Sequence, residues 1–194
     1  EVDRRERGSF QHEILKEFHR RLQAQGQRWR DVSTAEARAL VCRIGNELTP
    51  AFRGGLFLAS ASGRFTARTL VEALEQLMEA LIGWAEQYRF DPHAVEVSFG
   101  LKESPLPAWR IDLGEGHALR LRGRIDRVDL CRAADSDAAL AVIVDYKSRG
   151  RPFDTVKLRH GLELQLLAYL GVLSHLADPQ GEFKAARLVP AGVF

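Results

Sequence analysis

An acid and a base follow directly on an apolar run in the stretch AVIVDYKSRG, residues 141–150. Residues two apart on a β-strand point to the same face, so Asp145 and Lys147 are expected to project together at the rim of the core. The letters SRG then predict a turn. An ion pair at the end of a strand would account for this pair of side chains. A catalytic site would account for them equally.

A second charged stretch, ALRLRGRIDRVDL (residues 118–130), alternates apolar and charged residues with the period of a strand. One face is apolar, and the other carries Arg120, Arg122, Arg124 and Asp126. The apolar phase then moves to Val128 and Leu130, which predicts a twist or bulge near Asp126. As a pattern of charges alone, such a face is more often a solvated surface with internal ion pairs than a site.

Residues 109–130 are expected to form a hairpin around the turn GEGH, and this hairpin would bring Asp126 beside the strand that ends at Asp145. Two carboxylates from neighbouring strands, with a lysine beside them, are suited to metal-assisted hydrolysis of phosphodiesters. Hard divalent cations such as Mg²⁺ prefer oxygen ligands, and a bound ion polarises a phosphate and lowers the pKa of an attacking water. Lys147 would orient that water or neutralise the charge that develops in the transition state.

The composition is ordinary for a soluble globular protein, with 194 residues of which 45% are hydrophobic and 28% charged. The length favours one domain with a substantial core. No apolar run is long enough to span a membrane, and the start EVDRRERGSF lacks the apolar core of a signal peptide. A first residue other than Met and the apolar ending RLVPAGVF indicate a fragment of a longer chain.

The formal charge of +2 gives no strong overall attraction for polyanions, so the placement of the basic residues matters more than their number. The two cysteines, Cys42 and Cys131, are too few for a disulfide framework or a zinc site. Sparse cysteines and the lack of a secretory signal favour a cytoplasmic location.

Hydrophobic periodicity predicts three helices in the first half of the chain. They are expected at residues 8–25, 33–48 and 66–88, the second beginning with a capping box of Ser33 and Glu36. The last of the three keeps one face apolar, through Leu70, Leu74, Leu77, Met78, Leu81 and Trp84.

After Pro92 the period changes to that of strands. In HAVEVSFG, residues 93–100, Val95, Val97 and Phe99 alternate with polar residues. The hairpin, a buried strand at residues 139–147, a helix at residues 161–178 and a terminal strand follow. This order predicts an α/β fold with a central mixed sheet flanked by helices. We expect a single domain over residues 1–194 with a helical insertion at residues 27–90.

Four motifs in order resemble one known family. GSFQH (residues 8–12), GRIDRVD (123–129), VDYKS (144–148) and QLLAY (165–169) resemble the PD-(D/E)XK nuclease superfamily, and within it the RecB-like domains. The likeness extends to the C-terminal nuclease domain of AddB-type helicase–nuclease subunits, over about residues 8–194. Each motif is short, but their order, spacing and expected elements agree. The resemblance implies a restriction-endonuclease-like core.

The family's first acid corresponds to Asp126, its D-x-K motif to Asp145 and Lys147, and its helical histidine to His12. The resemblance implies that His12, Asp126, Asp145 and the backbone carbonyl of Tyr146 bind Mg²⁺, or Mn²⁺ in vitro. Lys147 would position or activate the attacking water. From the residues alone, His12 lies beside the apolar stripe of its helix, where a histidine is more often a boundary residue than a ligand.

The Q-x-x-x-Y motif of the family corresponds to Gln165 and Tyr169, which would order the site and its substrate. Residues four apart on a helix share a face, as a joint role requires, although any amphipathic helix offers the same arrangement. Glu96 matches a family strand only weakly and is kept as a weaker site candidate. His19 and Asp129 are expected to be structural, Asp129 as the partner of an arginine.

Basic residues flank the expected site in sequence, and phosphate contacts by such residues would supply affinity without sequence specificity. The candidates for DNA binding are Arg124, Arg127, Arg149, Arg151, Lys157 and Arg159. The substrate implied by the resemblance is single-stranded DNA at ends supplied by a helicase subunit, in end processing and recombinational repair.

AddB-type domains commonly carry an iron–sulfur cluster, with one cysteine ahead of the first helix and three near the C-terminus. Cys42 and Cys131 lie elsewhere and are expected to be structural, so such a cluster could belong only to a longer parent chain. Two alternatives stay open: a stand-alone RecB-like exonuclease or CRISPR-adaptation nuclease, and a DNA-binding module without catalysis. The intact set of Asp126, Asp145 and Lys147 argues against the inactive module.

Overall fold

The computed structural model describes residues 2–132, 136–146, 154–160, 162 and 164–194. The chain forms two compact units, Glu1–Asp91 and Pro92–Phe194, which are described separately. The helical insertion expected at residues 27–90 falls within the first unit, and the single domain over the whole chain stays a prediction. Within the described residues, no helix is both long and apolar enough to cross a membrane.

The first unit contains three long helices joined by short turns. α1 spans Arg4–Ala24, α2 spans Thr34–Leu48 and α3 spans Ala61–Gln87, with the short 3-10 turns η1 (Trp29–Asp31) and η2 (Phe52–Gly54) between them. Ser33 and Glu36 form the predicted capping box ahead of α2. Gly26 follows α1 with a φ of 69°, the left-handed conformation that commonly ends a helix. The three predicted helices are confirmed.

Aromatic side chains dominate the core of the first unit. Phe57 is fully buried, and its ring centroid lies 4.6 Å from that of Phe10. Trp29 is also buried and donates its indole N–H to Nδ1 of His19 at 3.0 Å, so His19 is structural, as predicted. Trp84 was expected on the buried face of α3, but it is 47% exposed. The buried stripe runs instead through Ala67, Val71, Leu74, Met78, Leu81, Ile82 and Ala85.

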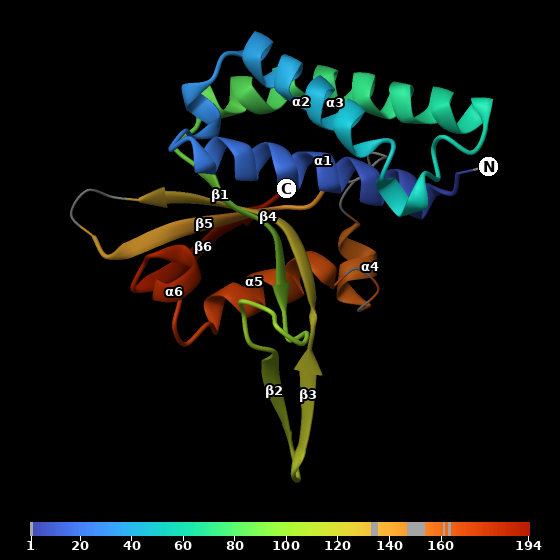
Figure 1. Ribbon diagram of the computed structural model, residues 1–194. Helices are drawn as coiled ribbons and strands as arrows, with labels where there is room; N and C mark the ends of the chain where they lie inside the picture. Colours follow the sequence, from blue (N-terminus) through green and yellow to red (C-terminus); the bar gives the residue numbers. More distant parts are fainter. Residues whose placement is uncertain (1, 133–135, 147–153, 161, 163) are drawn as a thin grey trace. The chain divides into compact units, whose positions relative to one another are not determined.

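A four-stranded mixed sheet forms the centre of the second unit (Figure 1). Its strands are β1 (Asp91–Phe99), β4 (Gly123–Arg132), β5 (Ala138–Val144) and β6 (Arg187–Val193), in the order β1-β4-β5-β6. β4 and β5 are antiparallel, whereas β5 and β6 are parallel. The predicted α/β fold with a mixed sheet is confirmed.

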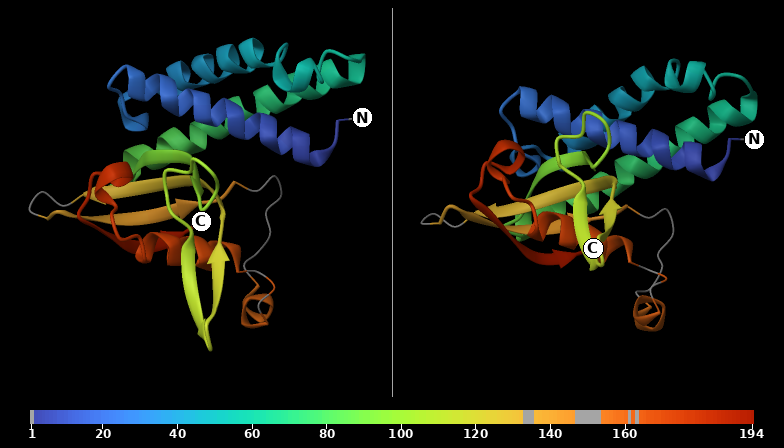
Figure 2. Two further views of the ribbon diagram at one scale, coloured as in Figure 1. Left: turned by 60° about the horizontal axis from the view of Figure 1, so that its bottom comes forward. Right: turned by 90° about the horizontal axis from the view of Figure 1, so that it is seen from below.

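α5 (Gln165–Ser174) runs along one face of this sheet (Figures 1 and 2). Tyr169, Val172 and Leu173 of α5 pack there against apolar residues of all four strands in one core cluster. The helix is shorter than the predicted 161–178, since it begins at Gln165 and ends at Ser174. Two short helices, α4 (Thr155–Arg159) and α6 (Gln180–Phe183), lie on either side of it in sequence.

The predicted hairpin is present, but it forms a sheet of its own. β2 (Trp109–Gly114) and β3 (His117–Leu121) pair only with each other, and Arg122 separates β3 from β4. The run that was expected to be one strand therefore contributes to two sheets. The hairpin extends away from the four-stranded sheet (Figures 1 and 2). At its tip, Glu115 has a φ of 49° between two glycines that also have positive φ, as the sequence GEG allows.

Candidate active site

Asp126 and Asp145 lie where β4 and β5 stop pairing. The register joins Arg127 to Val144, so the two acids stand one step beyond the last pair, at neighbouring strand positions. Asp126 is 9% exposed, and its Oδ2 accepts a hydrogen bond of 2.8 Å from the backbone N–H of Tyr146. Asp145 is half-buried, and its backbone N–H donates to the carbonyl of Phe194 at 2.9 Å. The segment that follows β5 is thus tied to the carboxylate of Asp126.

Glu96 on β1 joins this acidic group, although the sequence supported it only weakly. Carboxylate oxygens of Glu96 and Asp126 lie within 4.8 Å of each other. The Glu96 side chain is only 8% exposed, and its Oε2 accepts a hydrogen bond of 3.1 Å from Arg124. Glu96 also has a φ of 55°, a conformation that costs a residue with a side chain on the order of 1–3 kcal/mol.

The backbone of Glu96 explains how its carboxylate comes to lie beside Asp126. The sequence predicts that Val95, Val97 and Phe99 share the apolar face, but the buried residues are Ala94, Val97 and Phe99. The apolar phase therefore shifts by one residue between Ala94 and Val97. Such an irregularity re-aims a side chain, and it is the reason that simple alternation did not identify Glu96 as a site residue.

The donor set suits a hard divalent cation. Oxygens of Glu96 and Asp126 at a separation within 4.8 Å can both reach one ion at the roughly 2.0–2.6 Å typical of Mg²⁺ and Ca²⁺. Burial of both carboxylates adds to this fit, because two negative charges held close together in a low-dielectric site are stabilised by a cation. The carboxylate of Asp145 lies outside this grouping, beside it at the end of β5.

The start of α5 supplies polar groups next to Asp145. The side-chain amide of Gln165 donates to Oδ1 of Asp145 at 3.3 Å and to the hydroxyl of Tyr169 at 2.9 Å. The ring of Tyr169 is buried and packs edge-on against Phe99 of β1, with ring centroids 5.9 Å apart. The shared helix face expected for Gln165 and Tyr169 is confirmed, and a chain of hydrogen bonds leads from it to Asp145.

Arg127 was expected to bind DNA, but its side chain is buried, which favours a structural role instead. Its Nε lies 2.7 Å from Oδ1 of Asp129, its Nη2 donates to Oδ2 of the same carboxylate, and both residues are less than 10% exposed. Its Nη1 donates to the Tyr146 hydroxyl at 2.7 Å. Burial raises the pKa of Tyr146 to about 12, so this phenol is neutral at pH 7. Asp129 is the structural partner that the sequence predicted.

The other predicted residues occupy varied positions. Arg124 and Lys157 are largely exposed and form ion pairs with Glu96 and Asp154, and Arg159 is exposed at the end of α4. His12 lies half-buried on α1, in the first unit. Lys147, Arg149 and Arg151 fall outside the described residues. Cys42 and Cys131 are free thiols in separate units, and burial raises the pKa of Cys42.

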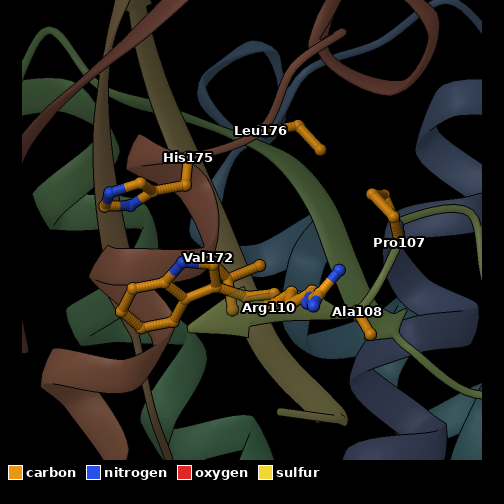
Figure 3. A pocket seen from close by; sticks show the side chains of 7 residues that line it. Pro107, Ala108, Arg110, Val172, His175 and Leu176 are labelled. Atoms are coloured by element: carbon orange, nitrogen blue, oxygen red, sulfur yellow. The ribbon is translucent and has the colours of Figure 1, made fainter. Parts of the chain in front are cut away.

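A pocket of about 260 Å³ at the foot of the β2–β3 hairpin was not anticipated. Val172 of α5 and the two residues just after its end, His175 and Leu176, face Pro107, Ala108 and Arg110 across it (Figure 3). Trp109 also lines this pocket and stacks on His175, with ring centroids 5.0 Å apart. None of the clustered carboxylates lines it, so the pocket is separate from the acidic site.

A mixed sheet with carboxylates gathered at neighbouring strand positions, and with a polar helix start beside them, suits the chemistry of metal-assisted hydrolysis. Comparison with known sequences gives the family. The sequence profile of the PD-(D/E)XK nuclease superfamily matches residues 1–193, and the chain belongs to this superfamily.

Several curated relatives carry one name, that of the AddB-type subunit of an ATP-dependent helicase/deoxyribonuclease. The protein from Moorella thermoacetica is 33% identical over 189 residues, which cover 93% of this chain and 16% of the relative. The protein from Lysinibacillus sphaericus is 37% identical over 85% of this chain and 14% of its own length. That from Symbiobacterium thermophilum is 35% identical over 95% and 16%. The chain thus spans about one sixth of the relatives that it matches, and it resembles their nuclease part as the motifs predicted.

Proposed function

We propose that this chain is a Mg²⁺-dependent deoxyribonuclease domain that hydrolyses phosphodiester bonds of single-stranded DNA from an end. The observation that carries the proposal is the pair of buried carboxylates, Glu96 and Asp126, within 4.8 Å of each other and next to Asp145. Membership of the nuclease superfamily and the relatives' name supply the reaction class and the substrate.

In this proposal Asp126, Asp145 and Glu96 hold the cation with their carboxylate oxygens. The family resemblance adds the carbonyl of Tyr146 and the imidazole of His12. When bound, Mg²⁺ would polarise the scissile phosphate and lower the pKa of a water. The hydrogen bond from the Tyr146 N–H to Asp126 fixes one carboxylate and holds Tyr146 close to it.

Lys147 follows Tyr146 directly and would direct the attacking water. Gln165 would hold the side chain of Asp145 in place through its amide, since it is itself oriented by the hydroxyl of Tyr169. Groups that are already held by hydrogen bonds need little reorganisation when charge develops in the transition state. Arg124, Lys157 and Arg159 would contact DNA phosphates outside the acidic site.

The proposal extends to the parent protein. A helicase subunit or domain would deliver the single strand, as the relatives' name implies for those proteins. The work would be end processing in recombinational repair, in the cytoplasm. Any iron–sulfur cluster would belong to the longer parent chain.

The test is cleavage of end-labelled single-stranded DNA with Mg²⁺ or Mn²⁺, by the wild-type chain and by the Asp126→Asn and Lys147→Ala variants. Asp137→Asn is the matched control, because Asp137 is an exposed acid just ahead of β5, at the end away from Asp145. We expect metal-dependent cleavage that EDTA abolishes, that both site variants lose and that the control retains.

Circular dichroism shows whether the variants are folded, and isothermal titration with Mn²⁺ shows whether Asp126→Asn has lost the ion. Cleavage that survives in folded Asp126→Asn contradicts the site assignment. A wild-type chain that binds Mn²⁺ and single-stranded DNA but cuts nothing supports the alternative of a DNA-binding module without catalysis.

A further inference from the structure

The exposed face of the β2–β3 hairpin carries an unusual arrangement of like charges. The register places Arg110 directly opposite Arg120, and both side chains are exposed. Arg122 follows Arg120 by two residues and is exposed as well. We call Arg110, Arg120 and Arg122 the arginine row. No ion pair joins any of the three to an acid within the described part of the chain.

Such an arrangement is unfavourable for the protein alone. Side chains directly opposite each other on antiparallel strands lie close together, and like charges there destabilise the pair. The acid on the same face, Asp112, lies opposite Ala118, and its carboxylate accepts a hydrogen bond from the backbone N–H of Gly114. A bound polyanion would reverse the effect, because each phosphate could take a bidentate hydrogen bond from a guanidinium group.

Two members of the arginine row, Arg120 and Arg122, come just before β4, the strand that carries Asp126. Arg120, Arg122 and Arg124 are spaced two residues apart across the junction of β3 and β4, and such a step is roughly 6.6 Å where the backbone is extended. This spacing is close to that of successive phosphates in an extended single strand of nucleic acid. Arg124, at the end of the series, donates to Glu96, whose carboxylate lies within 4.8 Å of that of Asp126.

The foot of the hairpin is fixed to the helix that serves the site. Trp109 lies over Gly171 of α5 so closely that a Cβ at Gly171 would overlap the indole ring. Trp109 also stacks on His175, the residue that caps the C-terminal end of α5. Arg110, the next residue, lies beside the pocket that α5 and the 107–110 segment enclose (Figure 3). The foot of the hairpin, and with it Arg110, is therefore fixed to the helix that begins at Gln165.

We propose that the β2–β3 hairpin is a phosphate-binding arm on which Arg110, Arg120 and Arg122 hold the backbone of single-stranded DNA and lead it to the acidic site. The inference rests on the proposed nuclease function and adds to it a binding surface outside the residues flanking the D-x-K motif. Contacts to phosphate carry no base preference, as a nuclease that degrades any sequence requires.

The experiment compares the wild-type chain with the triple variant Arg110→Gln/Arg120→Gln/Arg122→Gln. A second triple variant, Arg4→Gln/Arg5→Gln/Arg38→Gln, removes the same charge from exposed positions of the first unit. Binding to fluorescent oligo(dT) is measured by anisotropy in EDTA, so that no strand is cut, over a series of salt concentrations. Cleavage by the wild-type chain with Mg²⁺ is measured separately.

Each lost phosphate contact on a single strand lowers the slope of log K against log salt by about 0.7, so the hairpin variant should lose about 2. At 0.1 M salt this corresponds to binding weakened by up to about 100-fold. The first-unit variant should keep the wild-type slope. The thermal midpoint of the hairpin variant should equal or exceed that of wild type, because the repulsion between Arg110 and Arg120 is gone.

An unchanged slope in the hairpin variant, or an equal loss in both triple variants, overturns the inference. If the wild-type chain nevertheless cuts DNA with Mg²⁺, the nuclease proposal stands and only the arm is refuted. A wild-type chain that neither binds oligo(dT) in a salt-dependent way nor cuts it overturns both.

Discussion

Replacement of Arg127 by methionine distinguishes a role in DNA binding from a structural role in the core. If Arg127 contacted DNA, its loss would weaken binding and leave stability almost unchanged. In the structure, its guanidinium is buried and bound to Asp129 and to the hydroxyl of Tyr146. We therefore expect Arg127→Met to destabilise the second unit and to leave the salt dependence of DNA binding as it is in the folded protein.

The expected magnitude follows from burial. Arg127 is 4% and Asp129 is 7% exposed, so removing the arginine leaves a carboxylate in the interior without its bidentate partner. Breaking a buried ion pair from one side costs about 3–5 kcal/mol, whereas replacing both partners by apolar residues is often neutral or stabilising. The Tyr146 hydroxyl also loses a hydrogen bond worth about 1 kcal/mol. The double variant Arg127→Met/Asp129→Leu should accordingly recover most of the stability that Arg127→Met loses.

Urea unfolding followed by circular dichroism measures the free energy of unfolding, and hydrogen exchange of the β4 and β5 amides assigns the loss to the second unit. Arg187→Met is a control, because it removes an arginine from β6 of the same unit at an exposed position. A loss below about 1 kcal/mol in Arg127→Met, or a double variant as unstable as the single one, would refute the reasoning from burial.

Three further predictions concern α5 and α1. Tyr169→Phe should change stability by no more than about 1 kcal/mol in thermal unfolding, because the ring stays packed, and should slow DNA cleavage, because Gln165 loses the hydroxyl that orients it. Gly171→Ala should destabilise the protein by about 1–3 kcal/mol through overlap with Trp109, and in a Trp109→Ala background it should instead stabilise by up to about 1 kcal/mol, as helix propensity predicts. Hydrogen bonds and ion pairs from neighbouring arginines lower the pKa of Glu17 to about 2. The ionised Glu17 therefore stabilises the protein above its unfolded pKa of 4.5, and this stabilisation is lost as the pH falls toward 2. Over that range the free energy of unfolding of the wild type should fall by on the order of 1 kcal/mol more than that of Glu17→Gln, after allowance for solvent screening.

The parts of the fold that could be predicted from sequence are those decided by local periodicity and capping. Gly26 marks the end of α1, and the capping box at Ser33 marks the start of α2. Both signals could be recognised because they act within a few residues of the chain. The buried strand that ends before Asp145 was evident from its apolar run. The order of the acidic motifs then indicated that Asp126 and Asp145 would meet at neighbouring strands.

What could not be predicted depends on residues far apart in sequence. The break at Arg122 arises because β3 pairs with β2 while β4 pairs within another sheet, and a continuous alternation carries no sign of such a division. The same is true of Glu96, whose positive φ shifts the phase of β1 and turns its carboxylate toward Asp126. Contact between Gly171 and Trp109 joins two elements separated by four others, and only the fold reveals it.

The motif GRIDRVD shows why charge alone does not identify a functional residue. Arg124 and Arg127 differ by three positions in one strand, yet the first is largely exposed and reaches Glu96, whereas the second is buried and neutralised by Asp129. Two unfavourable features lie elsewhere in the second unit. Of the described non-glycine residues with positive φ, only Glu96 lies inside a strand, and Arg110 faces Arg120 across the hairpin. Both unfavourable features would be relieved or used by a ligand, a cation in one case and a phosphate chain in the other. A strained glutamate beside Asp126 and a pair of opposed arginines on the hairpin are what a domain that binds both a metal and DNA would use, and the Mn²⁺ and oligo(dT) titrations test the two sites separately.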